Sequence, residues 1–261
     1  MINLPHTWHG AGSPLVLISG LGGKGTSWQP FLERAAEHFR VLTFDLRGSG
    51  LAPRLPRGAT IRDLAEDVLQ LLDKVGLQSA ALMGRSMGGM IAQELALLAP
   101  ERVSSLVLVS TTGRADRHLA SIFELWAHMA ETRVPPAVRH QSSLLWCLGQ
   151  AALEDDATVR SYLEWKGRTD RPDDYAIQAR ACAGHDALER LGALLARTLV
   201  VSGTDDRLTP PAHAEALAKA LPSAELAYIP AAGHLPYLEK HEEFASLVLG
   251  FLAGDAGERG E

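Results

Sequence analysis

A serine flanked by small residues is the strongest chemical signal in the chain. Residues 84–88 read Gly-Arg-Ser-Met-Gly and fit the pattern G-x-S-x-G, with Ser86 at the centre. The apolar run 80–83 precedes this pattern, and a stretch with helical spacing follows it. A sharp strand-to-helix turn exposes a serine hydroxyl only where the neighbouring residues are small. The spacing therefore predicts that Ser86 is a nucleophile.

A serine hydroxyl is a weak nucleophile, so Ser86 needs a base. The chain has ten histidines, and His234 is favoured because it follows Gly233 in a loop between the last apolar run and the final helical stretch. A histidine in that loop can reach across the ends of the central strands and accept the serine proton. His185, in a helical segment, and His241, at a charged helix start, are the competing candidates.

An acid is expected to orient the imidazole of His234. Residues 203–206 read Gly-Thr-Asp-Asp and follow another apolar run. The spacing Gly-x-x-Asp favours Asp206 over Asp205, although both carboxylates could instead solvate the loop or cap the next helix. The chain order Ser86, Asp206, His234 is typical of one particular fold with a strand–turn–helix nucleophile.

Short apolar runs bounded by turn residues must form the elements that position these side chains. Such runs are typical of buried parallel strands, and amphipathic stretches with helical spacing lie between them. The alternation predicts an α/β fold, with a mostly parallel central sheet covered by helices on both faces. The runs are residues 15–18, 41–44, 80–83, 106–109, 198–201 and 226–229.

One long segment interrupts the alternation. Residues 113–197 contain no convincing strand and read as several helices. We therefore predict a core formed by residues 1–112 and 198–261, with a helical cap, or lid, inserted at 113–197. The polar tail from Gly254 onward is expected to be frayed.

Composition narrows the classes of partner. Of the 261 residues, 46% are hydrophobic and 21% are charged, and the net charge is −6 with both signs interspersed. A nucleic-acid partner is not expected, because no basic stripe occurs. A membrane span is not expected, because no apolar run approaches about 18 residues. The start lacks a signal-peptide pattern, and the two cysteines show no metal-ligand spacing. We expect a cytoplasmic protein with a small-molecule substrate, and a homo-oligomer is compatible with the sequence.

Several motifs together resemble the α/β-hydrolase fold superfamily across essentially the whole chain. Within it, the chain is similar to the esterase and enol-lactone hydrolase group with a compact helical cap. The start Ser-Gly-Leu-Gly-Gly at Ser19 also resembles the aminoacrylate and carbamate hydrolases. The motifs are residues 18–23 (Ile-Ser-Gly-Leu-Gly-Gly), 45–50 (Asp-Leu-Arg-Gly-Ser-Gly), 84–89, 203–206 and 233–234.

The resemblance implies Ser86 as nucleophile, Asp206 as acid and His234 as base. It also implies an oxyanion hole formed by the backbone amides of Leu21 and Met87. The reaction expected of these residues needs no cofactor and no metal. Many members of the superfamily have His-Gly in the oxyanion loop, where this chain has Ser19 and Gly20. The donor is a backbone amide, so the departure leaves open only which hydrogen bonds make this loop rigid.

These residues predict a serine hydrolase that cleaves a carboxylic ester or lactone of a small to medium, partly apolar substrate. The aromatic side chains Trp126 and Trp146 of the cap and the charged Arg85 beside the nucleophile are candidate substrate-binding residues. The same residues at Ser86, Asp206 and His234 could instead serve a non-hydrolytic enzyme that cleaves or closes C–C bonds, or the scaffold could act as a receptor.

An NAD(P)-dependent oxidoreductase is the alternative from another enzyme class. Residues 20–25 match G-x-G-x-x-G, and Asp45 follows at the distance of a ribose-binding acid. Tyr162 and Lys166 have a Tyr-x-x-x-Lys spacing that resembles the short-chain dehydrogenases. Pro30 argues against this reading, because it obstructs the helix that would have to begin at Gly25 and bind a pyrophosphate.

Overall fold

The computed structural model describes residues 2–29, 31–167 and 171–257, and its strands form one sheet. The strand order is β1-β3-β2-β4-β5-β6-β7, in which β1 is antiparallel to β3 and all other pairs are parallel. The predicted α/β fold is confirmed, and each of the six apolar runs lies inside a strand. The strands are β1 (His6–His9), β2 (Ser13–Ile18), β3 (Phe39–Phe44), β4 (Ala80–Arg85), β5 (Val103–Val109), β6 (Arg197–Gly203) and β7 (Ala224–Ile229).

The edge strand β1 was not predicted. Its four residues, His-Thr-Trp-His, are partly exposed and carry no apolar run. Antiparallel pairing with β3 places His6 opposite Phe44 and His9 opposite Val41. The guanidinium of Arg40 on β3 lies 4.1 Å from the centre of the Trp8 ring. The neighbouring strand, rather than the local sequence, therefore supplies the reason for this strand to form.

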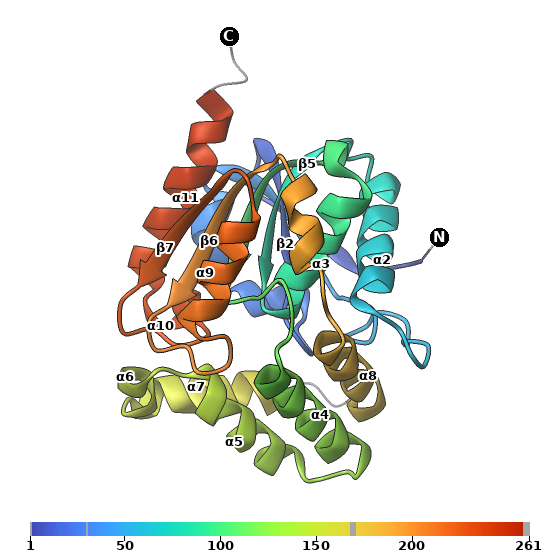
Figure 1. Cartoon of the computed structure of the whole chain (residues 1–261), viewed down its shortest axis with the longest axis vertical. Helices are drawn as coiled ribbons and strands as arrows, with labels where there is room; N and C mark the ends of the chain where they lie inside the picture. The colour runs from blue at the N-terminus through green and yellow to red at the C-terminus, as the bar shows by residue number, and fades with distance from the viewer. Residues whose placement is uncertain (1, 30, 168–170, 258–261) are drawn as a thin grey trace.

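Helices cover both faces of the sheet (Figure 1). On one face, α2 packs against α3, and α3 and α9 pack on the strands; on the other face, α1 packs against α11. α11 continues to Gly257, so residues 254–257 of the tail expected to be frayed are helical here, and residues 258–261 lie outside the described part of the chain. The helices outside the cap segment are α1 (Phe31–Ala36), α2 (Ile61–Lys74), α3 (Met87–Leu98), α9 (Pro211–Ala220), α10 (Pro236–Glu239) and α11 (His241–Gly257), with short 3-10 helices η1 (Gly25–Trp28) and η2 (Pro100–Arg102).

The ends of α2 follow from local sequence. The side chain of Thr60 accepts a hydrogen bond from the amide of Asp63, and the Asp63 carboxylate accepts one from the Thr60 amide. This reciprocal capping satisfies amides that have no partner inside the helix. The helix ends before Gly76, whose φ of +73° is costly for other residues.

Residues 113–196, between β5 and β6, are called the cap segment below; the predicted cap, 113–197, also includes Arg197, which is the first residue of β6. The cap segment lies beyond the carboxyl-terminal ends of the parallel strands (Figure 1). In its described residues, the only β pairing is the isolated bridge between Arg114 and Asp186. Its elements are α4 (Arg117–Glu131), α5 (Pro136–Cys147), α6 (Gln150–Leu153), α7 (Asp156–Gly167), α8 (Pro172–Ala183) and η3 (Leu188–Ala193).

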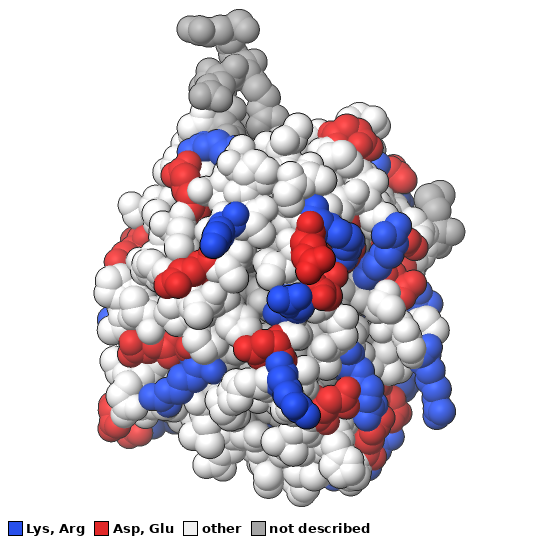
Figure 2. All heavy atoms as spheres, in the orientation of Figure 1, with Lys and Arg blue, Asp and Glu red and all other residues white. Residues whose placement is uncertain are grey.

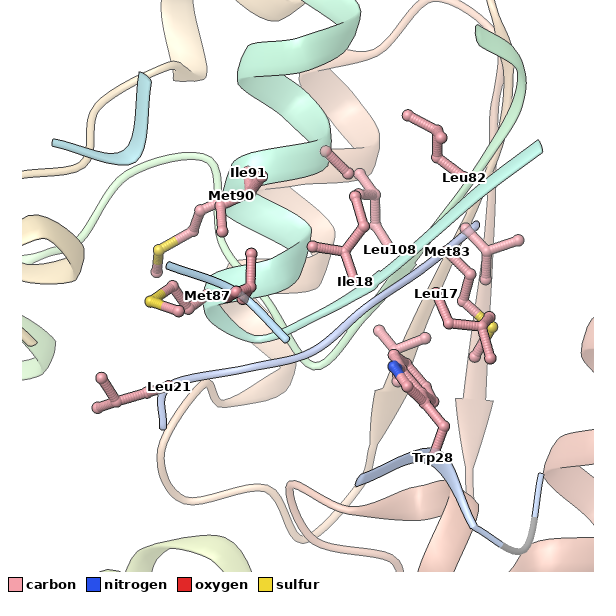
Figure 3. Packing of buried hydrophobic residues seen from close by; sticks show 14 of the residues in the cluster. Leu17, Ile18, Leu21, Trp28, Leu82, Met83, Met87, Met90, Ile91 and Leu108 are labelled. Carbon is pink, nitrogen blue, oxygen red and sulfur yellow. The ribbon is translucent and has the colours of Figure 1, made fainter. Parts of the chain in front are cut away.

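The central strands are buried on both faces; in β4, every residue is covered. Met87 and Ile91 of α3 belong to the same buried cluster as Ile18 of β2 and Leu108 of β5 (Figure 3). On the surface, basic and acidic side chains alternate over the face drawn in Figure 2 without a broad area of one sign. None of the helices in the described ranges combines the length and apolar character that crossing a membrane requires.

Asp67 is an ionisable group buried inside this packing. It lies on α2, its Oδ1 is 3.6 Å from Nη1 of Arg47, and its Oδ2 has no hydrogen-bond partner among the described residues. Burial raises the pKa of Asp67 to about 6, and Arg47 offsets only part of the effect. The unfolded pKa is about 4. Protonated Asp67 therefore makes its full contribution to the free energy of unfolding below pH ~4, and this contribution is lost as the pH rises through about 6.

Asp67→Asn should therefore raise the free energy of unfolding at pH 8 by about 1–2 kcal/mol and change it little at pH 4. Urea unfolding at the two pH values measures the difference. Glu66→Gln is the control, because the Glu66 side chain is exposed and pairs with Arg62 of the same helix; its effect should stay within about 0.5 kcal/mol. A loss of stability in Asp67→Asn at pH 8 would show that the pairing with Arg47 outweighs burial.

Candidate active site

Ser86 occupies a strained turn between β4 and α3. Its φ of +54° and ψ of −122° are rare for a residue with a side chain. A Cβ added to Gly84 would lie 2.3 Å from the carbonyl oxygen of Gly88, and one added to Gly88 would lie 2.0 Å from that of Ile18. These distances explain why the positions two before and two after the serine must be glycine.

Hydrogen bonds from neighbouring elements fix this turn. The amide of Ser86 donates to the carbonyl of Val109 at 2.9 Å. The carbonyl of Ser86 accepts from Oγ1 of Thr111 at 2.8 Å and from the amides of Gly89 and Met90. The backbone of Ser86 is thus held from β5 and from α3, which supports its strained conformation.

His234 and Asp206 form a buried pair. Nδ1 of His234 lies 2.9 Å from Oδ2 of Asp206, and both side chains are almost fully covered. The other oxygen of Asp206 accepts from the amides of Leu208 and Thr209, and Oγ1 of Thr209 donates to Oδ2 at 2.8 Å. A carboxylate fixed by this many donors can hold the imidazole in one orientation.

The alternatives to these two residues lie elsewhere. Asp205 is half-buried, and its carboxylate accepts a hydrogen bond from Oγ1 of Thr204 at 3.2 Å. His185 is buried beside Gln93 of α3, and burial lowers its pKa to about 4. Nε2 of His241 lies 3.7 Å from Oε1 of its chain neighbour Glu242. The structure therefore brings His234 together with Asp206 rather than with Asp205.

Ser86 and His234 both follow strands of the parallel sheet, so they lie at the same sheet edge. Nε2 of His234 is buried and has no hydrogen-bond partner among the described residues. Oγ of Ser86 likewise makes no hydrogen bond to any residue that the structure describes. Hydrogen bonds between a nucleophile and its base are often long in ligand-free enzymes and tighten when substrate binds.

The loop that carries Leu21 is braced by Ser19. Oγ of Ser19 donates to the carbonyl of Lys24 at 2.8 Å, and the amide of Gly23 donates to the carbonyl of Gly20 at 2.9 Å. A Cβ on Gly20 would lie 3.2 Å from Cβ of Ser86, so the loop passes close to the serine. Ser19 thus supplies the hydrogen bond that the departure from His-Gly left open.

Two backbone amides near Ser86 are free to act as donors. Met87 is the first residue of α3, where an amide has no acceptor inside the helix. Over the described ranges, neither the amide of Met87 nor that of Leu21 donates a hydrogen bond. Free amides at a helix start and in an adjacent loop are suited to stabilise a developing negative charge.

The glycine-rich loop does not open an α-helix. Gly25 begins the four-residue 3-10 helix η1. The carboxylate of Asp45 accepts from the amides of Gly25 and Leu51, so both its oxygens serve the protein itself. Tyr162 is buried with its hydroxyl 2.8 Å from Oγ of Ser143, and the side chain of Lys166 lies outside the described residues. These contacts give Gly25, Asp45 and Tyr162 structural roles.

Most of the chain matches one protein family. Residues 13–241 match the family model of the alpha/beta hydrolase fold. The chain belongs to this family. It is 34% identical to "Putative non-heme bromoperoxidase BpoC" of Mycobacterium tuberculosis over 259 residues, which cover 97% of this chain and 98% of that protein. It is also 34% identical to "Putative carbamate hydrolase RutD" of Variovorax paradoxus over 251 residues, covering 93% and 92% of the two chains.

A solved structure supports the same assignment. The enol-lactonase from Burkholderia xenovorans LB400 superposes with a TM-score of 0.88 at 27% identity, covering 97% of this chain and 98% of that one. The expected resemblance to the α/β-hydrolase superfamily is therefore confirmed, and the chain is a hydrolase-type enzyme of this family. Its described residues contain no group of three or more His, Cys, Asp or Glu side chains suited to hold a metal ion.

A cavity of about 340 Å³ in this α/β-hydrolase lies between the core and the cap segment. Its described lining includes Gly22, which follows Leu21, together with the phenol rings of Tyr162, Tyr175 and Tyr237. The guanidinium of Arg85 lies 5.4 Å from the centre of the Tyr237 ring, so Arg85 borders a lining residue.

The two tryptophans predicted to bind substrate contact other rings of the cap segment. Trp126 is buried and packs edge-on against Phe123, with ring centres 5.9 Å apart. Trp146 packs against His118 at 5.5 Å. Neither ring is among the described residues that line the 340 Å³ cavity.

Glu239 was missed by the sequence reasoning. Its Oε2 accepts from the amides of Gly149 and Gly233, and its Oε1 accepts from the amide of Leu235. Its carboxylate therefore binds the residues on both sides of His234 and joins them to the cap segment. Burial raises the pKa of Glu239 even though these three amides lower it. The only signal in the sequence was a carboxylate five residues after the histidine.

Glu239→Gln should loosen the loop around His234, because a carboxamide cannot accept from all three amides without turning its own NH₂ toward one of them. We expect the free energy of unfolding to fall by about 1–3 kcal/mol. Amide hydrogen exchange should become faster at Gly149, Gly233 and Leu235. Glu242→Gln, at an exposed carboxylate paired with Arg34, should change neither quantity. Unaltered exchange at the three amides in Glu239→Gln would contradict this account.

Proposed function

We propose that this α/β-hydrolase cleaves a carboxylic ester or lactone through an acyl-enzyme on Ser86. The observation that carries the proposal is the buried pair of Asp206 and His234, with Nδ1 of the histidine bound to the acid and Nε2 without a partner among the described residues. An imidazole held in this way can accept a proton at Nε2 while the carboxylate stabilises the positive charge that forms.

The reaction follows from the roles we propose for the individual atoms. Oγ of Ser86 attacks the carbonyl carbon while its proton passes to Nε2 of His234. The electron pair of the C=O bond moves to oxygen, and the amides of Leu21 and Met87 donate to the resulting oxyanion. Collapse of this intermediate breaks the bond to the leaving alcohol, which takes the proton from His234. A water molecule, with His234 again as base, then releases the acid and restores Ser86.

The size of the substrate is inferred from the cavity lined by Gly22 of the oxyanion loop, although its described lining does not include the proposed catalytic side chains themselves. Its volume of about 340 Å³ fits a small to medium molecule, and its tyrosine rings favour a partly apolar one. An enol-lactonase among the structural neighbours supports a cyclic or open ester as the substrate class. We propose no metal and no organic cofactor for these steps, since each proton transfer has a donor and an acceptor within the chain or the solvent.

Ser86→Ala should lower turnover of a p-nitrophenyl ester by at least several hundred-fold, because it removes the nucleophile. A fluorophosphonate probe should label the wild-type chain on the peptide that contains Ser86, as mapped by mass spectrometry. Ester cleavage at the wild-type rate by Ser86→Ala would exclude the acyl-enzyme. An active Ser86→Ala combined with an inactive His234→Ala would indicate acid–base chemistry without acylation.

Asp206→Asn should lower turnover by up to ~10⁴-fold, because an amide no longer fixes the required tautomer of His234. Asp205→Asn is the matched control one residue away, and its turnover should stay within about threefold of the wild type. Steady-state kinetics on the same ester compares the two variants. Equal losses in both would refute the assignment of the acid to Asp206.

A further inference from the structure

We propose that Gln178 of the cap segment is a positioning residue for the loop that presents the amide of Leu21 to the oxyanion. The inference rests on the ester hydrolysis proposed above. It concerns how the cap segment contributes to the reaction, since Gln178 acts through the loop and need not touch the substrate itself.

The carboxamide of Gln178 is completely buried and fully hydrogen-bonded. Its Oε1 accepts from the amide of Gly22 at 2.9 Å. Its Nε2 donates to the carbonyl of Arg47 at 2.8 Å and lies 3.1 Å from Oγ of Ser49. One side chain on α8 therefore joins the loop after β2 to the loop after β3.

Gly22 is held at a second point by the same helix. Its φ is +68°, and a Cβ at this position would lie 3.1 Å from the ring of Tyr175. Tyr175 and Gln178 are three residues apart, so they share one face of α8. On this face, the ring of Tyr175 lies close to Gly22, and Oε1 of Gln178 accepts the hydrogen of the Gly22 amide. Gly22 directly follows Leu21, whose amide we assign to the oxyanion hole.

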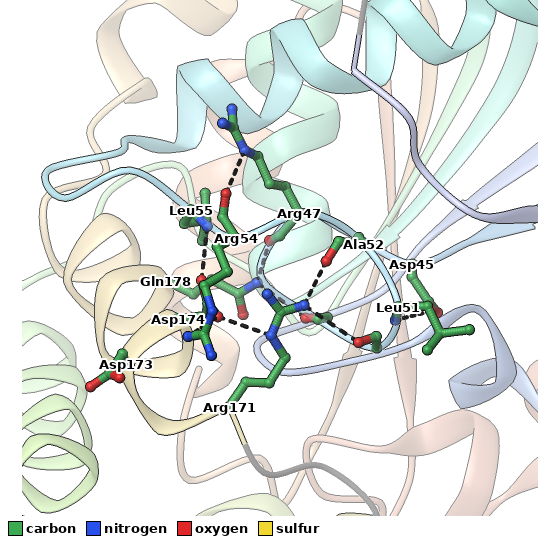
Figure 4. A network of polar contacts seen from close by, with 12 residues as sticks. Asp45, Arg47, Leu51, Ala52, Arg54, Leu55, Arg171, Asp173, Asp174 and Gln178 are labelled. Carbon is green, nitrogen blue, oxygen red and sulfur yellow. Dashed lines mark hydrogen bonds and ion pairs between the residues drawn. The ribbon is translucent and has the colours of Figure 1, made fainter.

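α8 is in turn anchored to the core, so it is a firm support. The buried carboxylate of Asp174 accepts from the amide of Leu55 at 2.8 Å and from Nε of Arg171 at 2.9 Å. Arg171 also donates to the carbonyl of Ala52 at 2.6 Å. Figure 4 shows these contacts beside Gln178, on the side of the helix that faces the loop after β3.

Only a carboxamide has the required set of donors and acceptors. Glutamate at this position could accept from Gly22, but it would turn an oxygen toward the carbonyl of Arg47. Methionine would keep a similar shape and leave the amide of Gly22 buried without its acceptor. Either change should let the loop depart from the geometry that fits the transition state, because oxyanion donors act only when their position is fixed in advance.

The test compares Gln178→Glu and Gln178→Met with the wild type on a p-nitrophenyl ester and on a boronic acid. The boronic acid forms a tetrahedral adduct with the serine and so mimics the transition state. We expect kcat/KM to fall by ~10–100-fold and the affinity for the boronic acid to fall in parallel. Affinity for the intact ester, measured in the Ser86→Ala background with and without the Gln178 change, should shift by less than about threefold.

The matched controls are Gln141→Glu and Gln141→Met, at an exposed glutamine of α5. Both should retain wild-type kinetics, and all assays are made well below the unfolding midpoint of each variant. Wild-type boronic acid affinity and wild-type kcat/KM in folded Gln178 variants would overturn the inference. Equal losses of ester and boronic acid affinity would also overturn it, because they would indicate a damaged pocket rather than a displaced oxyanion donor.

Failure of the underlying function would look different. A wild-type chain that neither cleaves the ester nor binds the boronic acid would refute the proposed hydrolysis, and the role of Gln178 with it. A wild-type chain that does both, with unchanged Gln178 variants, would refute only the role of Gln178.

Discussion

Hydrogen bonding between parallel strands is the constraint on which the rest of the molecule depends. Because β2, β4, β6 and β7 run in one direction, the loops that follow them all emerge at one edge of the sheet. Those loops carry Leu21, Ser86, Asp206 and His234, which are far apart in the sequence. The central strands, buried on both faces, also make this edge rigid, since neither layer of helices leaves room for them to shift.

The assigned nucleophile has a strained backbone. The positive φ of Ser86 is compatible with folding because Val109, Thr111 and α3 all bond to its backbone. Gly84 and Gly88 let the chain pass through the turn without collision. At the same edge, Nε2 of His234 is buried and has no partner within the described ranges, which is costly unless the nitrogen serves binding or catalysis.

The cap segment is bound into the site by polar contacts of single residues. Gln178 holds the loop after β2, and the carbonyl of Cys147 accepts from the amide of His234 at 2.9 Å. Glu239 adds a bond from the histidine loop to Gly149 of the same segment. The described part of the cap segment thus covers the sheet edge and also fixes the loops on which the assigned oxyanion donor and base are carried.

Local signals determined much of this protein from the sequence alone. The six parallel strands, the capped start of α2 and the turn at Ser86 could be predicted, because apolar runs, capping residues and small neighbours act over a few residues. Strand β1 could not, because its only reason to form is a neighbour more than 30 residues away. The choice of Asp206 over Asp205, the bond from Ser19 to Lys24, and the contacts of Gln178 and Glu239 were likewise decided by tertiary structure. Each depends on which way a side chain points once distant segments have packed, and hydrogen bonds are sensitive to that direction at distances of about 3 Å.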